Sequence, residues 1–156
     1  MFHELEDFVK ILNSTRDFLQ LALNEIPDER FNWSPTPSTS STETILKHVG
    51  LWETTYISRI QYGDDRTVDH SISALSGKDA VLNKLSEIRQ QSLDALSQLQ
   101  PEDMEREFDH NGNPFNVRRM LINWPRHEAY HIGQIFYIGM QLNPNQPNAL
   151  PEPPRL

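Results

Sequence analysis

Cysteine is absent from this sequence of 156 residues, and its absence removes several kinds of chemistry at once. Without cysteine the chain has no disulfide framework, no thiolate nucleophile and no cysteine-ligated zinc site. Imidazole and carboxylate side chains remain as the candidate metal ligands. The absence also fits a reducing compartment, so we expect a cytoplasmic protein.

Positive charge and long apolar runs are also scarce. Fourteen Lys and Arg stand against 22 Asp and Glu, which gives a formal net charge of −8. A surface with this balance repels a phosphate backbone, so we expect no nucleic-acid partner. No run approaches the roughly 20 apolar residues of a membrane span, and the first residues are acidic where a secretory signal would be basic. We therefore expect neither membrane binding nor export.

Apolar residues recur every three or four positions along most of the chain, which is the period of helices with one buried face. They predict four helices, which cover residues 4–26, a segment from Ser41 or Thr42 to Tyr62, a segment from Ser76 to Pro101, and residues 117–142. A chain of this length suits one core. We predict an all-α fold, with a four-helix bundle over residues 1–142 and an extended proline-rich tail over residues 143–156.

Local signals refine this prediction at three places. Ser40 and Glu43 have the spacing of a capping box at the start of the second helix. The pair Asn111-Gly112 is typical of a tight turn, so a short hairpin is expected between residues 105 and 116. Pro125 lies inside the last helix, where it removes one backbone hydrogen bond and should kink the helix.

Three of the six histidines fall on the predicted apolar seams. His127 and His131 are four residues apart, so their rings lie on adjacent turns of the last helix, close enough to share one metal. His48 lies on the seam of a different helix. A histidine at a core position can also simply be a hydrogen-bonded core residue, but the three together favour a metal site. His3, His70 and His110 are expected in solvent.

The segment from His127 to His131 also fits the H-E-x-x-H motif, in which two histidines bind zinc and the glutamate activates water. The extended form of that motif needs glycine and histidine at positions that hold Gln134 and Tyr137, so a metalloprotease is a weaker alternative. Glu128 and His131 match half of a di-iron pattern as well. That pattern needs a second copy, and Ile45 precedes His48 by three where a glutamate is required.

Three motifs together resemble the DinB/YfiT-like superfamily: Leu46-Lys47-His48-Val49-Gly50, then His127-Glu128-x-x-His131-x-Gly133-Gln134, and Trp33-Ser34-Pro35. The resemblance covers nearly the whole chain and implies a four-helix bundle in up-down-down-up order, with the long connection between the second and third helices. It further implies a homodimer and a divalent metal, zinc or nickel most often, on His48, His127 and His131. Ile132 departs from the arginine frequent in the family.

Similar bundles include thiol transferases that use bacillithiol and a mycothiol-dependent isomerase. The resemblance implies a metal-dependent transferase of the thiol S-transferase type, or a hydrolase, acting on a small molecule, with a low-molecular-weight thiol as a candidate cofactor. Glu128 is the candidate general base, and its alternative is a solvated surface carboxylate. Gln134 lies on the same face as His127 and is a candidate to orient a ligand. A non-enzymatic alternative is a metal-stabilised, stress-related binding module.

Overall fold

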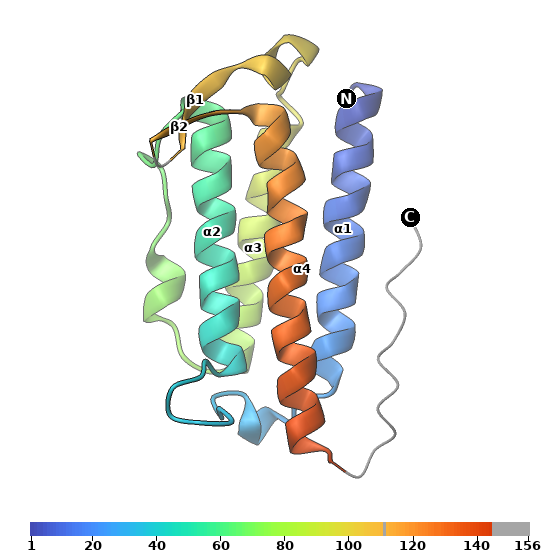
Figure 1. Cartoon of the computed structure of the whole chain (residues 1–156), viewed down its shortest axis with the longest axis vertical. Helices are drawn as coiled ribbons and strands as arrows, with labels where there is room; N and C mark the ends of the chain where they lie inside the picture. Colours follow the sequence, from blue (N-terminus) through green and yellow to red (C-terminus); the bar gives the residue numbers. More distant parts are fainter. Residues whose placement is uncertain (111, 145–156) are drawn as a thin grey trace.

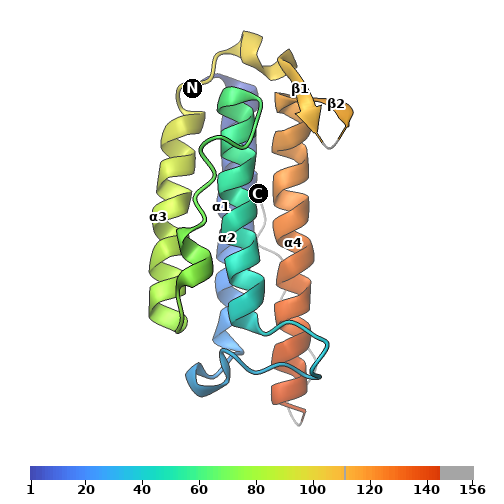
Figure 2. The ribbon, with the colours of Figure 1, turned by 90° about the vertical axis from the view of Figure 1, so that its left-hand side faces the viewer.

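The computed structural model describes residues 1–110 and 112–144. Its main elements are four long helices that lie side by side (Figures 1 and 2). They are α1 (His3–Asn24), α2 (Thr42–Tyr62), α3 (Lys78–Leu96) and α4 (Val117–Leu142). Three short 3-10 helices lie in the connections, and these are η1 (Asp28–Arg30), η2 (Ser71–Ala74) and η3 (Pro101–Glu105).

The helices pack so that α2 and α4 are neighbours. α1 packs against α4, and α2 packs against both α3 and α4. In Figure 1, α1 and α4 run downward from the end that carries the N-terminus, whereas α2 and α3 run upward. The connection from Gly63 to Gly77 returns along α2 to the lower end of the bundle, where α3 begins.

Local sequence signals set both ends of α2. The helix begins at Thr42, but its cap is Ser41 rather than Ser40, because the Ser41 hydroxyl accepts a hydrogen bond from the backbone N–H of Thr44 at 3.2 Å. Glu43 instead accepts the backbone N–H of Gly77 at 3.0 Å. Gly63 ends the helix with φ +79°, a left-handed conformation that glycine adopts without steric cost.

The prediction of an all-α chain is corrected by a small antiparallel sheet between α3 and α4. Its strands are β1 (Glu107–His110) and β2 (Asn113–Asn116), and Phe108 is paired with Phe115. The sheet lies where the turn signal had indicated a hairpin. α4 follows directly, capped by the Asn116 side chain, and continues through Pro125 as one helix.

The core consists of two apolar clusters with charged residues between them. The lower cluster includes Leu19, Val49, Leu85 and Ile132, and the upper cluster includes Leu12, Tyr56, Leu96 and Trp124. Each helix contributes one charged residue between its parts of the two clusters; three of these residues are buried, and the one on α1 is partly buried. This charge quartet consists of Arg16 on α1, Glu53 on α2, Arg89 on α3 and Glu128 on α4.

Two further predictions concern the C-terminal tail and membrane-spanning helices. The predicted tail, residues 143–156, lies outside the described residues except for its first two positions. Within the described part of the chain, none of the helices combines the length and the apolar character that crossing a membrane requires.

Candidate metal centre

The structure brings together the three histidines that the sequence had singled out. His48 comes from α2, and His127 and His131 come from successive turns of α4. The Nε2 atom of His127 lies 3.2 Å from Nε2 of His48 and 3.1 Å from Nε2 of His131. One ring nitrogen from each residue lies within 4.8 Å of the other two. These three residues are called the histidine triad below.

The donor atoms of the triad fit a divalent cation. Two imidazole nitrogens on one tetrahedral zinc ion lie about 3.3 Å apart, because each Zn–N bond is about 2.0–2.1 Å long. Burial, together with the neighbouring His131 and His48, lowers the pKa of His127 from 6.5 to about 4. Burial and His131 also lower the pKa of His48. Neutral imidazole is the form that ligates metal, so these shifts favour binding near neutral pH.

The triad lies at the edge of the bundle rather than on its inward seams, which corrects the prediction. His48 is exposed, and His127 and His131 are partly buried. The buried face of α4 instead passes through Trp124, Glu128 and Ile132. Because side chains one position apart differ by about 100° around a helix, the triad is displaced from the core by this one step. The displacement leaves the triad accessible from solvent.

Aromatic rings and one amide surround the triad. The rings of Trp52 and Tyr56 lie 5.5 and 5.9 Å from the ring of His127, between centroids. The Nδ1 atom of His131 lies 2.7 Å from Oε1 of Gln134. An amide oxygen only accepts, so His131 donates its Nδ1–H and keeps the Nε2 lone pair toward the other histidines. Gln134 therefore orients a triad residue, in the manner that its position in the sequence suggested.

Glu128, the candidate general base, lies in the charge quartet and not at the triad. Its side chain is 1% exposed, so it is not a solvated surface group. Oε1 lies 2.8 Å from Nε of Arg16, and Oε2 lies 2.8 Å from Nη2 of Arg89. Glu53 contacts the same two guanidinium groups. Both carboxylate oxygens of Glu128 thus face arginines from other helices.

The three remaining histidines differ in how far they are exposed to solvent. His3 and His70 are exposed, as expected. His110 is partly buried on β1, and its Nδ1 contacts the guanidinium of Arg59, so the prediction that it is solvated is corrected. Burial and the charge of Arg59 lower the pKa of this ring.

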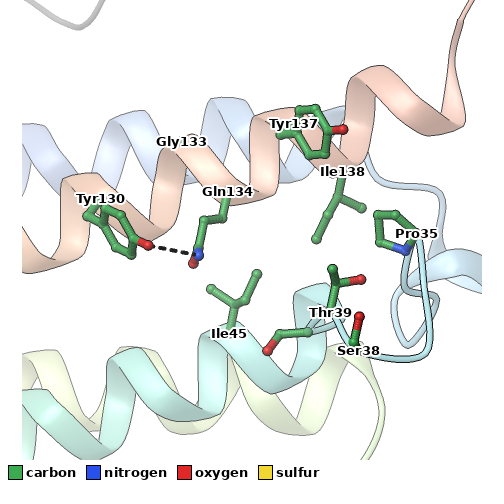
Figure 3. A pocket seen from close by; sticks show the side chains of 10 residues that line it. Pro35, Ser38, Thr39, Ile45, Tyr130, Gly133, Gln134, Tyr137 and Ile138 are labelled. Carbon is green, nitrogen blue, oxygen red and sulfur yellow. Dashed lines mark hydrogen bonds between the residues drawn. The ribbon is translucent and has the colours of Figure 1, made fainter.

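A cavity of about 530 Å³ opens beside the triad (Figure 3). α4 forms one wall with residues that include Tyr130, Gln134 and Tyr137, and the opposite wall consists of Pro35, residues 38–40 and Ile45 of α2. Gln134 belongs to both the cavity and the triad's surroundings. The sequence analysis did not find this cavity, because it forms between segments about a hundred residues apart.

Comparison with known proteins agrees with this fold. The sequence matches the DinB superfamily over residues 11–135, so the chain belongs to that superfamily. A DinB-like protein from Bacillus subtilis superposes with a TM-score of 0.70 at 20% identity, covering 88% of this chain and 92% of the other. A DinB-like protein from Bacillus cereus gives 0.68 at 17% identity, covering 92% and 96%. No curated protein matches the chain.

Proposed function

We propose that the histidine triad binds one divalent cation, zinc or nickel, and that the chain is a metal-dependent enzyme acting on a small molecule. The observation that carries this proposal is the convergence of three ring nitrogens from α2 and α4. Three imidazoles leave at least one coordination position for water or substrate, as in catalytic zinc sites. A cation bound there lowers the pKa of a coordinated water or thiol and so supplies a nucleophile at neutral pH.

The chain's own residues support either of two reactions. With a low-molecular-weight thiol as co-substrate the enzyme is a thiol S-transferase, and with water it is a hydrolase. In both, Gln134 fixes the tautomer of His131, and the rings of Trp52 and Tyr56 exclude water from one side of His127. The exposed edge at His48 leaves the site open to a ligand.

The placement of Glu128 argues against the metalloprotease alternative. In an H-E-x-x-H protease the glutamate must reach the water it activates. Here Arg16 and Arg89 contact both oxygens of Glu128 inside the bundle. The proposal therefore assigns Glu128 to the framework that holds α4 and leaves proton transfer to the substrate, the thiol or solvent.

Metal content of untagged protein tests the proposal. Wild-type protein dialysed against zinc or nickel and then against buffer should retain about one equivalent, measured by mass spectrometry of the elements. His48→Ala should lose most of it, because a ligand is removed, whereas His70→Ala, which alters an exposed loop histidine, should retain it. Wild-type protein that retains no metal would refute the metal site.

Turnover distinguishes an enzyme from the non-enzymatic alternative. Metal-loaded wild type, His48→Ala and His70→Ala are compared in thiol-conjugation, ester-hydrolysis and amide-hydrolysis assays. Activity that His48→Ala loses and His70→Ala keeps supports the enzyme. A metal that raises the melting temperature while all three assays show no turnover favours the metal-stabilised binding module.

A further inference from the structure

The described residues that line the cavity beside the triad are uncharged, although the protein as a whole is acidic. Ten of the residues that the structure describes line the cavity, and none of these ten is Lys, Arg, His, Asp or Glu. Its polar side chains are those of residues 38–40, the two tyrosines and Gln134. The remaining side chains, among them Pro35, Ile45 and Ile138, are apolar (Figure 3). A volume of about 530 Å³ lies within the range of small-molecule sites.

Two tyrosines on α4 give the cavity flat, accessible rings. Tyr130 is 66% exposed and Tyr137 is 56% exposed, although both are large and partly apolar. They lie seven residues apart, which places them on the same face of α4, and Figure 3 shows Gly133 between them. Exposed aromatic rings that line a cavity are suited to stack against a planar ring of a ligand.

The cavity adjoins the histidine triad, because its lining residues Gln134 and Tyr130 both contact His131. Oε1 of Gln134 faces Nδ1 of His131 at 2.7 Å, and its Nε2 donates to the Tyr130 hydroxyl at 3.4 Å. The rings of Tyr130 and His131 are 5.1 Å apart between centroids. A ligand in the cavity therefore lies next to the residues that would hold the cation.

We infer that this cavity binds the body of the substrate, and that the substrate is an uncharged small molecule with a planar ring and a hydroxyl or amide group. The inference rests on the proposed function, because the end of the substrate that reacts would lie toward the triad. A carboxylate or phosphate in the cavity would lose hydration and find no cationic partner among the lining residues of the described part of the chain. The net charge of −8 adds long-range repulsion of anions. Strongly anionic thiols are therefore poor ligands for this cavity.

Gly133 allows the cavity to be filled without disturbing the fold. A Cβ atom built at this helical glycine meets no atom within 4 Å, so a side chain there extends into open space. Gly133→Phe should then occupy the cavity. Ala129→Phe is the matched control, because Ala129 is also exposed on α4 but does not line the cavity. Tyr137→Ala, which removes one ring from the wall, is a second test that does not depend on Gly133.

A matched pair of probes tests the charge and shape of the ligand. Para-mercaptomethyl benzyl alcohol and para-mercaptomethyl benzoate share the thiol and the ring and differ in one uncharged or anionic group. Calorimetry with zinc-loaded protein should show that the alcohol binds at least about tenfold more tightly, a difference of about 1.4 kcal/mol. Gly133→Phe and Tyr137→Ala should weaken the alcohol about tenfold, whereas Ala129→Phe should not. Ser38→Lys should raise affinity for the benzoate.

A metal-free arm separates this inference from the proposed function. Para-methylbenzyl alcohol has no thiol, and its contact with metal-free wild-type protein is measured by saturation-transfer NMR. A signal that Gly133→Phe abolishes and Ala129→Phe keeps supports the cavity even if the protein binds no zinc. Equal affinity for the alcohol and the benzoate would overturn the substrate class. Undiminished binding to both Gly133→Phe and Tyr137→Ala would overturn the cavity itself.

Discussion

Gln134 joins the triad to the cavity, and its substitution should weaken metal binding without removing a ligand. Gln134→Leu removes the acceptor for the Nδ1–H of His131, so the ring loses its fixed tautomer and orientation. Such partners of a ligand are worth about ten- to a hundredfold in metal affinity. Zinc affinity measured by chelator competition should fall by that amount in Gln134→Leu and be largely retained in Gln134→Glu, which keeps an acceptor. Equal affinities for wild type and Gln134→Leu would contradict this role.

Tyr56 should make the free energy of unfolding decrease as pH rises through the alkaline range. Its side chain is 2% exposed, and burial raises its pKa from 10.0 to about 12 against the opposing effects of Arg59 and Asn123. The unfolded chain therefore releases this proton first, and stability falls as pH rises from about 10 to about 12. The loss is about 2–3 kcal/mol. Urea unfolding should show it in wild type but not in Tyr56→Phe, and absorbance at alkaline pH should differ between the two proteins over the same range.

At the scale of the helices, the charge quartet predicts that Glu128→Gln mainly affects stability. The substitution leaves Arg16 and Arg89 with Glu53 as their remaining carboxylate in a buried position. Breaking a buried ion pair from one side costs about 3–5 kcal/mol. Urea unfolding should show a loss of this size for Glu128→Gln. Glu87→Gln, which removes an exposed pair with Lys84, is the control and should cost less than about 1 kcal/mol.

The two roles considered for Glu128 give opposite results in that experiment. A residue of the framework lowers stability when it is changed and leaves zinc stoichiometry intact. A general base lowers turnover and leaves stability intact. Full stability of Glu128→Gln together with a large loss of turnover would therefore return Glu128 to the chemistry of the site.

Helices were predictable where local signals marked their ends. The start of α2 at Thr42, its end before Gly63 and the range of α4 follow from caps, glycine and apolar period, which act over a few residues. The range of α3 was predicted less accurately: Ser76 forms no cap and Gly77 precedes the helix, and the helix ends at Leu96 before it reaches Pro101.

The triad was predictable because His127 and His131 are four residues apart on one helix and because His48 belongs to a motif that resembles the DinB superfamily. The position of the triad at the edge of the bundle was not predictable, because a shift of one residue along a helix moves a side chain from the buried face to the edge.

The charge quartet and the cavity could not be predicted from the same signals. Glu53 follows Val49 by four and precedes Tyr56 by three, so it continues the buried seam of α2. A charged residue is ordinarily expected to be exposed, so the sequence alone does not indicate that Glu53 is buried. Only its partners Arg16 and Arg89 on other helices make the burial of Glu53 favourable. The cavity wall at residues 35 and 38–40 meets α4 through the tertiary fold alone. No local pattern encodes that contact.

For the whole molecule, we predict a homodimer, as the DinB resemblance implies. Large apolar side chains at the surface, including Leu21, Tyr62 and Ile122, are suited to an interface between copies. Light scattering coupled to gel filtration should give twice the chain mass of 18.1 kDa at micromolar concentration. Substituting Leu21 or Ile122 with Lys should shift the mass toward one chain if the substituted residue lies in the interface. A mass of one chain for wild type over that concentration range would refute the dimer.

The charge quartet also constrains how the four helices are aligned along the axis of the bundle. Each helix contributes one charged residue between two apolar clusters, so a helix that slid by one turn, about 5.4 Å, would carry its charge into hydrocarbon. The three charges left behind would then face an apolar side chain. Apolar seams alone tolerate such slippage, because leucine and isoleucine can substitute for one another along a seam. We therefore expect the quartet to hold α2 and α4 in the one alignment that brings His48 level with His127.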